Sequence, residues 1–331
     1  MHFPFSGLEA NPIWIILWGI VTGYVFSTIG AAGAVLTMVG QTVLFKLDSA
    51  MVKTFMAGGM GEEAASKAAA GSVKVHNLMA VILAPIIAVP RYMKEKRVAL
   101  PLALCVGAGI VFGALIGPAI PMSLSAYKFW FGVITFVIGL RLFYETTDRY
   151  MQGKQKLQAV NKAFAEKMEE MKTTKNWDEF AAQGFAMNKF TIGEMRFTFW
   201  GQEFIVSPIV AALGGFFIAI IGSMFGLGGG FMLVPFLSSV FVLPMFICSS
   251  TSITVVLINS LVGAAGYLAR GAIIDWLYIG IFLIGVFVGS LVGPPSQKYY
   301  KEKYLRAFLA IVLLLLGLRF MGIFKMIGID I

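Results

Sequence analysis

The residues that decide the fold are Gly226-Leu-Gly-Gly-Gly-Phe-Met-Leu-Val-Pro235, a glycine-rich stretch inside a long uncharged run. The run covers residues 204–269, and none of its 66 residues is Asp, Glu, Lys or Arg. A helix needs about 20 mostly apolar residues to cross a bilayer, so the run is too long for one straight crossing. Backbone polar groups freed by a helix break are tolerated in a membrane only inside protein or beside a water-filled cavity. We therefore expect a broken helix at these glycines, at the centre of a membrane protein.

The composition of the whole chain also indicates a membrane protein. Of its 331 residues, 58% are hydrophobic and only 13% are charged, against roughly 25% charged residues in a typical soluble domain. Further uncharged runs cover residues 10–45, 98–127 and 276–297. These features exclude a soluble enzyme, a disordered protein and a nucleic-acid-binding protein, and membrane orientation explains the net charge of +9. We predict an all-α polytopic membrane protein with about 8–10 transmembrane or re-entrant helices.

Three sequence patterns recur in the same order in both halves of the chain. Residues 27–34 (Ser-Thr-Ile-Gly-Ala-Ala-Gly-Ala) align with residues 223–230 (Ser-Met-Phe-Gly-Leu-Gly-Gly-Gly). The other matches pair Gly109, Gly113, Gly117 and Pro118 with Gly285, Gly289, Gly293 and Pro294, and Gly139-Leu-Arg141 with Gly317-Leu-Arg319. Internal repeats are typical of transporters. We predict a first transmembrane repeat at residues 1–145, an insert at 146–203 and a second transmembrane repeat at 204–331.

The positively charged loops change sides between the two repeats. Loop 91–97 holds four Lys or Arg residues, whereas its counterpart around Arg270 holds one. Loop 121–127 holds none, whereas its counterpart 297–306 holds four. Because cytoplasmic loops carry an excess of Lys and Arg, this alternation favours inverted repeats with the insert in the cytoplasm and both termini outside.

The insert is rich in Lys and Arg and has the pattern of an amphipathic helix. Its apolar residues recur at steps of three and four, which places them on one helix face; they are Leu157, Val160, Phe164, Met168 and Met171. We expect a basic amphipathic cytoplasmic helix. Two interpretations remain open, an interfacial helix that only connects the repeats and a surface that regulates the protein or binds a partner.

The glycine break suggests a site for an anion. The N-terminus of a half-helix presents free N–H groups and positive dipole character without any charged side chain. The candidate residues are Gly226, Gly228, Gly229 and Gly230, with Gly30 and Gly33 as the weaker copy in the first repeat. Close packing of helices through small residues is the alternative. A Walker nucleotide loop is disfavoured because no Lys-Ser or Lys-Thr follows the glycines.

Two polar segments lie at the expected starts of apolar helices. The first is Ser249-Ser-Thr-Ser252, followed by Asn259, and its repeat counterpart is Lys74-Val-His-Asn77. Such residues can cap helices, or their donors can face the same cavity as the glycines. The binding hypothesis names Lys74, His76, Asn77, Ser250, Thr251 and Ser252. An unperturbed histidine titrates near neutral pH, which makes His76 the candidate titratable group, although a histidine at a helix start can also be simply interfacial.

Catalytic and metal-binding patterns are not visible in the sequence. The two cysteines, Cys105 and Cys248, lie in apolar runs and are expected to be small buried hydrophobic residues. We expect no enzyme activity, no metal and no cofactor. A proton relay of carboxylates would have to use Asp48, Glu62 or Glu63, so a proton or sodium ion as coupling ion stays open.

Several motifs together resemble the TauE/SafE sulfite-exporter family. They are the glycine stretch, the Ser-Thr-Ser after it, Tyr267-Leu-Ala-Arg-Gly271 with Asp275-Trp276, Gly289-Ser-Leu-Val-Gly293 and the terminal Gly317-Leu-Arg319. The resemblance covers about 270 residues and excludes the insert. It implies a multi-pass transporter of the prokaryotic inner (plasma) membrane, built from two repeats, with small anions such as sulfite and organosulfonates as substrates.

The leading hypothesis is therefore a secondary transporter that exports a small, sulfur-containing oxyanion by alternating access. Its partners would be that anion and the lipid bilayer, with no nucleic acid; the sequence leaves the oligomeric state open. An anion channel is the nearest alternative, and a membrane scaffold that recruits a soluble protein through the insert is another. The first repeat departs from the family pattern, because Gly30-Ala-Ala-Gly33 replaces the richer glycine run and residues 48–72 form an extra segment.

Overall fold

The computed structural model describes residues 1–29, 32–147, 166, 184–297 and 302–323.

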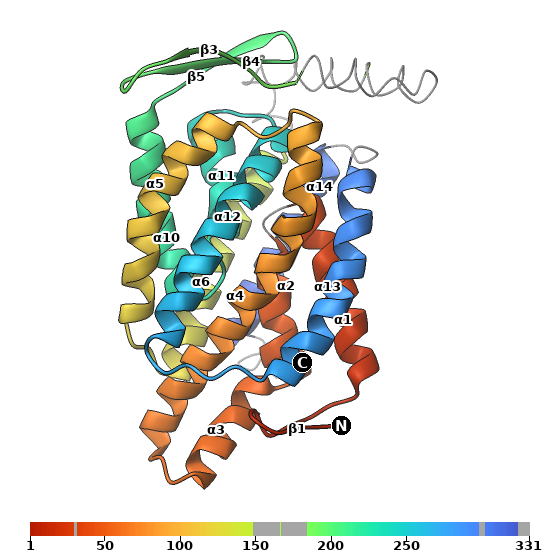
Figure 1. The fold of residues 1–331 in the computed structure, drawn as a ribbon, viewed down its shortest axis with the longest axis vertical. Helices are drawn as coiled ribbons and strands as arrows, with labels where there is room; N and C mark the ends of the chain where they lie inside the picture. The colour runs from red at the N-terminus through yellow and green to blue at the C-terminus, as the bar shows by residue number, and fades with distance from the viewer. Residues whose placement is uncertain (30–31, 148–165, 167–183, 298–301, 324–331) are drawn as a thin grey trace.

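The helices form a bundle, and a three-stranded sheet covers one end of it, which we name the sheet end (Figure 1). The N-terminus lies at the opposite end, which we name the N-terminal end. The helices are α1 (Pro12–Ile29), α2 (Ala32–Val39), the π-helical η1 (Gly40–Leu44), α3 (Leu47–Ala57), α4 (Glu62–Lys94), α5 (Leu100–Ile116), η2 (Gly117–Ala119), α6 (Leu124–Glu145), α10 (Pro208–Met224), α11 (Gly230–Val240), α12 (Met245–Leu268), α13 (Trp276–Gln297) and α14 (Glu302–Phe320). The strands are β1 (His2–Phe3), β2 (Leu8–Glu9), β3 (Ala186–Phe190), β4 (Met195–Phe199) and β5 (Gln202–Val206).

The helices have the length and hydropathy of membrane spans. Within the described residues, five helices can cross a bilayer, or six if α2 with η1 and the bent continuation α3 count as one span. Shorter apolar helices accompany them, namely most of α1, α10, α11 and the last part of α14. Large apolar side chains such as Phe112 (67% exposed) and Phe217 (60% exposed) cover the outside of the bundle, which suits contact with lipid. The predicted all-α polytopic membrane protein is confirmed.

Helices from opposite halves of the chain pack in pairs. α1 lies along α13, and α5 lies along α10. Glycine permits this approach, because a β-carbon on Gly285 would clash with the backbone of Ile16 and one on Gly109 with that of Ala212. The repeat aligns α5 with α13 and α1 with α10, so each half supplies the packing partner of the other. Small residues stabilise such pairs by close van der Waals contact, since lipid provides no hydrophobic drive between helices.

The same correspondence extends to individual side chains. A β-carbon on Gly117 would meet the Ser223 hydroxyl, and one on Gly293 would meet the Ser27 hydroxyl. Gly117 aligns with Gly293, and Ser223 with Ser27, in the two repeats. The remaining long pair, α6 and α14, is formed by the last helix of each repeat. These exchanged contacts agree with two related halves.

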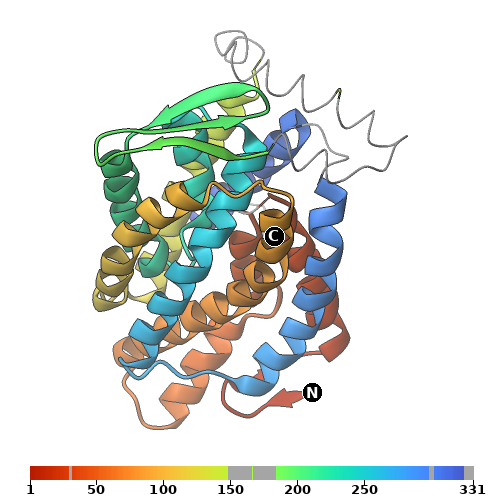
Figure 2. The same cartoon turned by 45° about the horizontal axis from the view of Figure 1, so that its top comes forward.

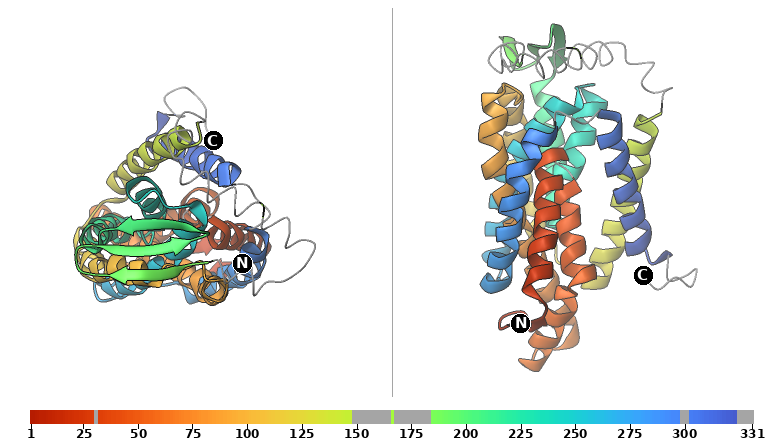
Figure 3. Two further views of the ribbon diagram at one scale, coloured as in Figure 1. Left: turned by 90° about the horizontal axis from the view of Figure 1, so that it is seen from above. Right: turned by 90° about the vertical axis from the view of Figure 1, so that its right-hand side faces the viewer.

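The two broken hairpins enter the bundle from opposite ends. α1 starts just after β2 at the N-terminal end, and α2, η1 and α3 lead the chain back to that end (Figures 1 and 3). α10 starts just after β5 at the sheet end, and α11 returns toward it. α2 and α11 contact each other inside the bundle. Opposite entry of equivalent hairpins is the arrangement expected of inverted repeats.

Residues 48–72, the extra segment of the first repeat, form most of α3 and the first turns of α4. α4 has 33 residues, so it is about 50 Å long and exceeds a hydrocarbon layer of about 30 Å. Figure 3 shows α3 and the start of α4 projecting beyond the other helices at the N-terminal end. The charged start of α4 is therefore placed at or beyond the membrane surface.

Part of the insert forms a β-sheet, which was not among the sequence-based predictions. β3, β4 and β5 are antiparallel in that order and lie across the end of the bundle (Figures 2 and 3). The inward side chains of β4 are buried, namely Met195, Phe197 and Phe199. The Phe185 N–H donates to Lys96 O at 2.7 Å and ties the sheet to the α4–α5 loop. β5 runs across the predicted boundary at residue 204, and α10 begins at Pro208. The predicted amphipathic helix at 157–171 lies outside the described residues.

Candidate functional site

The helix break predicted at the glycine stretch is present between α10 and α11. α10 ends at Met224 and α11 begins at Gly230. Gly226, Gly228 and Gly229 have φ values of 69°, 65° and 74°. These are left-handed conformations that glycine adopts without steric cost. The glycines thus let the chain reverse inside the bundle within a few residues.

The reversal leaves backbone donors free at the N-terminus of α11. The Gly226 and Leu227 N–H groups donate to Ser223 O and Gly222 O. The Gly228 and Gly229 N–H groups, by contrast, donate to no residue in the described part of the chain. The positive end of the α11 dipole lies at the same place.

Buried polar side chains without partners surround these donors. A β-carbon on Gly229 would lie 3.0 Å from Asn259 Nδ2, and one on Gly228 would lie 2.6 Å from Ser260 Oγ. Asn259 and Ser260 are fully buried. Both amide atoms of Asn259 and the Ser260 hydroxyl lack a hydrogen-bond partner among the described residues. Because buried polar atoms are almost always paired in native proteins, unpaired ones here point to a bound ligand or water.

Asn77 completes this group from the opposite side. Its Nδ2 donates to Gly226 O at 2.6 Å, while its buried Oδ1 has no partner within the described residues. We name Asn77, Gly228, Gly229, Asn259 and Ser260 the central cluster. It combines groups from α4, α12 and the glycine break, which are far apart in sequence.

Lys74 lies beside the central cluster with its ammonium buried. The residue is 2% exposed, and a β-carbon on Gly226 would lie 2.7 Å from the Lys74 β-carbon. Its Nζ lies 4.8 Å from the centre of the Tyr127 ring and 5.7 Å from that of the Tyr267 ring. No carboxylate of the described residues pairs with it; the buried Asp48 instead pairs with Lys128 at 2.5 Å. Cation–π contacts thus replace a counter-ion.

The two tyrosines are held in place by the end of α10. The Tyr267 hydroxyl donates to Ser223 O at 2.9 Å and Met224 O at 3.0 Å. The Tyr127 hydroxyl donates to Phe225 O at 3.3 Å. These bonds satisfy carbonyls that have no partner at a helix C-terminus. They also fix the rings on either side of the Lys74 ammonium.

His76, a predicted binding residue, has both ring nitrogens engaged elsewhere. Nδ1 lies 2.7 Å from Ser72 O, and Nε2 accepts from the Asp275 N–H at 2.8 Å. A carbonyl only accepts and an N–H only donates, so the proton is assigned to Nδ1 of a neutral ring. Asp275 in turn accepts from the Ser6 N–H and hydroxyl. The structure thus places His76 in a network that joins α4 to the start of α13 and the N-terminal hairpin.

Ser250, Thr251 and Ser252 also lie away from the glycine break. Ser250 Oγ donates to Arg97 O at 2.7 Å, and Thr251 Oγ1 accepts from the Ala99 N–H at 3.1 Å. Ser252 Oγ donates to Ser249 O within α12. Nine residues of helix, about 13 Å, separate Ser250 from Asn259. The Ser250 and Thr251 hydroxyls thus connect α12 to the α4–α5 loop.

The capping interpretation of both polar segments is wrong. α12 begins at Met245 with Pro244 as its N-cap, and α4 begins at Glu62. Ser249 and Lys74 therefore lie inside helices. In the first repeat, Gly30 lies outside the described residues. A β-carbon on Gly33 would clash with Phe26, so Gly33 serves close packing between α1 and α2.

Three residues of the site were not singled out in the sequence, namely Ser260, Tyr127 and Tyr267. Asn259 and Asn77 carried a usable signal, because an amide inside an apolar membrane helix is costly unless it has a role. Tyr267 lay in a recognised motif without an assigned function. Tyr127 carried no local signal, since its partners Lys74 and Phe225 are 53 and 98 residues away.

Spanning helices with a broken hairpin and buried, unpartnered polar groups at the break define a polytopic membrane transporter. The chain belongs to the family described as Sulfite exporter TauE/SafE, whose model matches residues 15–320.

Two relatives are similar to the chain. A "Probable membrane transporter protein YunE" of Bacillus subtilis is 23% identical over 315 residues, which cover 94% of this chain and 98% of the relative. A "Probable membrane transporter protein" of Haemophilus influenzae is 25% identical over 100 residues, covering 30% of this chain and 37% of the relative. No solved structure matches the chain. These findings identify a membrane transporter.

Proposed function

We propose that this transporter carries a small oxyanion and binds it at the central cluster. The observation that carries the proposal is the buried, unpartnered amide of Asn259 beside the free Gly229 N–H. A buried amide and a helix N-terminus that share one place can donate several hydrogen bonds to an anion. The Ser260 hydroxyl supplies a further donor.

The charge around the cluster favours an anion over a cation. Metal cations and sodium prefer oxygen ligands with carboxylates among them. Residues 204–269 contain no Asp or Glu, and the nearest acidic residue before Lys74 on α4 is Glu63. Eleven helical residues, about 16 Å, separate Glu63 from Lys74. The positive end of α11 and the Lys74 ammonium thus both contribute positive potential near the cluster.

The substrate we propose is sulfite or an organosulfonate, carried outward. Support comes from the family, whose description names a sulfite exporter, and from a site that offers donors without a counter-charge. We propose the inner membrane as the location, as for the family, with the sheet end in the cytoplasm, because residues 91–97, at the end of α4 and in the α4–α5 loop, carry four Lys or Arg residues.

Alternating access is the transport mechanism that best suits the opposed hairpins. The α1–α2 and α10–α11 hairpins enter from opposite ends and touch through α2 and α11. A movement of one half against the other would open the central cluster to one side at a time. A proton or sodium ion could be coupled to this movement.

Proteoliposomes loaded with sulfite test this function. We expect efflux of radiolabelled sulfite to accelerate when unlabelled sulfite is present on the opposite side, because a carrier returns faster when loaded. Flux without this trans-stimulation would indicate a channel. The absence of any sulfite or sulfonate flux would contradict the proposal and leave a scaffold role to be tested.

A further inference from the structure

A pocket of about 250 Å³ opens at the N-terminal end of the bundle, on the far side of Lys74 from the glycine break. We propose that this pocket is a second anion site, separate from the central cluster, which holds an organic anion with a charged head and a short apolar body. The inference rests on the proposed function only where it assumes that the transported anion occupies this pocket during transport. Binding of an anion to the pocket is tested independently of transport. We name it the outer basic pocket.

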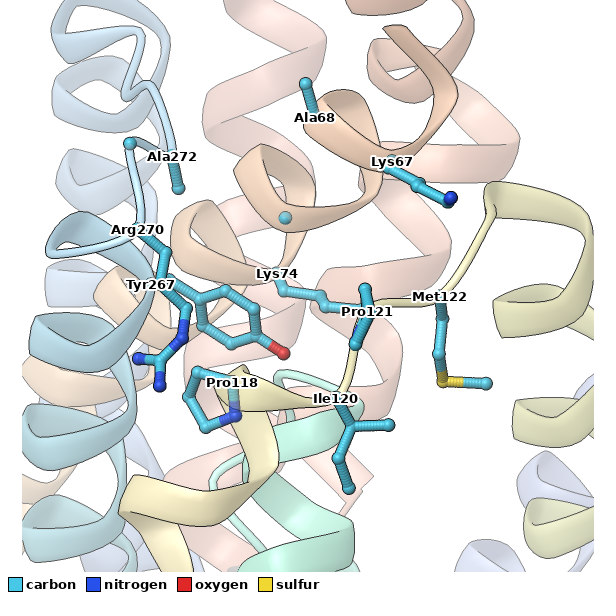
Figure 4. A pocket seen from close by; sticks show the side chains of 12 residues that line it. Lys67, Ala68, Lys74, Pro118, Ile120, Pro121, Met122, Tyr267, Arg270 and Ala272 are labelled. Atoms are coloured by element: carbon cyan, nitrogen blue, oxygen red, sulfur yellow. The ribbon is translucent and has the colours of Figure 1, made fainter. Parts of the chain in front are cut away.

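Among the described residues, three cations and no carboxylate line the outer basic pocket. The cations are Lys67 and Lys74 from α4 and Arg270 from the loop after α12. Figure 4 shows Lys74 reaching from α4 toward Pro121, with Tyr267 and Arg270 beside it. Lys67 and Arg270 are exposed, whereas Lys74 is buried. The cations therefore run from the surface to the bottom of the pocket, an arrangement that concentrates anions.

The two exposed cations, Lys67 and Arg270, differ in how many of their hydrogen-bond donors remain free for a ligand. Lys67 Nζ is paired with Glu63 at 2.6 Å in an exposed ion pair, which is weak in water. Arg270 donates from one nitrogen to Gly266 O at 2.9 Å. Its other N–H groups have no partner among the residues the structure describes. Since guanidinium binds carboxylate and sulfonate oxygens in a bidentate manner, Arg270 is the principal head-group ligand.

The wall opposite the cations is apolar. It is formed by the α5–α6 connection, with Pro118, Ile120, Pro121 and Met122. A pocket of this volume is near the lower limit for ligand sites, so it suits a small molecule. An inorganic oxyanion would leave the apolar wall uncovered, whereas an alkyl or aryl body would cover it. The combination of cations on one wall and apolar residues on the other therefore favours an organic anion.

The Lys74 side chain connects the two sites. Its β-carbon touches Gly226 of the break, and its ammonium lines the outer basic pocket. Tyr267 also lines the pocket, while its hydroxyl is bonded to the end of α10. Lys74 and Tyr267 therefore belong both to the wall of the pocket and to the surroundings of the glycine break. An anion in the pocket would pair with the ammonium of a side chain whose β-carbon packs against the break.

Calorimetric titration of the purified full-length protein with butanesulfonate tests this site. We expect Arg270→Gln to weaken binding about tenfold or more, as for loss of a charge-assisted hydrogen bond. Ile120→Asp should weaken it comparably by placing a carboxylate against the anion. The matched control is Lys53→Gln, which removes an exposed charge on α3 outside the pocket and should bind as the wild type does.

A central-cluster variant separates the two proposals. Asn259→Leu should retain butanesulfonate binding at the outer basic pocket even if it loses sulfite flux. Equal affinity of the wild type and Arg270→Gln would overturn the inference, as would absence of butanesulfonate binding. Loss of binding in Asn259→Leu would also overturn it, because there would then be one site only. Unchanged sulfite flux in Asn259→Leu would instead contradict the central site and leave the pocket standing.

Discussion

The Lys74 β-carbon packs against Gly226 of the glycine break, so closely that a β-carbon added to the glycine would lie 2.7 Å from it. The contact brings α4 of the first repeat against the break in the second. It also aims the lysine ammonium between the Tyr127 and Tyr267 rings. The glycine at 226 is thus required twice, for its left-handed backbone and for the approach of Lys74.

Replacement of this glycine should therefore disturb both folding and transport. Gly226→Ala places a β-carbon on a residue with φ of 69°, which costs about 1–2 kcal/mol, and the clash with Lys74 adds to it. We expect a lower thermal denaturation temperature in detergent and loss of flux. The matched control is Gly59→Ala, because Gly59 has φ of 93° but open space around it; it should keep normal flux. Equal behaviour of the two variants would contradict the role of the contact.

Removal of the Lys74 charge should separate stability from function. Lys74→Met keeps the length of the side chain and removes a buried ammonium that lacks a carboxylate partner. Because replacement of a buried charge by an apolar group is often neutral or stabilising, we expect thermal stability to be kept or raised. Sulfite flux should fall about tenfold or more, as for a lost charge-assisted bond. Wild-type flux in this variant would show that the ammonium does not serve the substrate.

His76 should prove to be structural. His76→Leu leaves the Ser72 carbonyl and the Asp275 N–H unpaired in a buried position, which costs about 1–3 kcal/mol. We expect a lower denaturation temperature but an unchanged KM for sulfite. His2, the second histidine, is exposed, and His2→Ala should change neither value. A raised KM in His76→Leu with intact folding would return the residue to the binding site.

Glycine packing between the halves can be tested on a single helix. A β-branched side chain at Gly285 of α13 would clash with α1, whereas Gly280 on the same helix has nothing within 4 Å. Gly285→Val should destabilise the protein by about 1–3 kcal/mol, the usual cost of overpacking. Gly280→Val should be close to neutral, and Gly109→Val, at the equivalent position of the other repeat, should resemble Gly285→Val. Thermal denaturation of the three variants decides the matter, and similar stability of Gly280→Val and Gly285→Val would contradict it.

The orientation of the bundle is accessible to thiol labelling. Gly193 lies in the β3–β4 turn at the sheet end, Gly61 lies between α3 and α4, and both have open space around them. In a background with Cys105 and Cys248 replaced by Ala, Gly61→Cys should react with an impermeant reagent in intact cells. Gly193→Cys should react only after permeabilisation. The reverse pattern would place the sheet end outside.

The sequence predicted the broken helix well because only a few physical solutions exist in a membrane. A cluster of glycines in an uncharged run of 66 residues cannot continue as a straight span, and lipid forbids an exposed break. The repeat was predictable for a similar reason. Its glycines are fixed by contacts such as that of Gly285 with Ile16, which tolerate no side chain.

The helix boundaries around Lys74 and Ser249 were not predictable in the same way. A lysine in front of an apolar segment is read as the end of a span, yet α4 continues for twelve residues before it. Two tyrosine rings allow this burial, and they come from residues 53 and 193 positions further along the chain. Local sequence contains no information about such distant partners. The sheet in the insert had a usable signal, since Met195, Phe197 and Phe199 alternate with more polar residues.

We propose above all that Asn259 and the glycine N–H groups bind the transported anion. Sulfite counterflow in proteoliposomes containing Asn259→Leu tests it most directly, because leucine has the same number and branching of side-chain heavy atoms as asparagine and lacks the amide. We expect counterflow to fall to the background of protein-free vesicles, while the variant keeps the thermal stability of the wild type. Counterflow at the wild-type rate would contradict it.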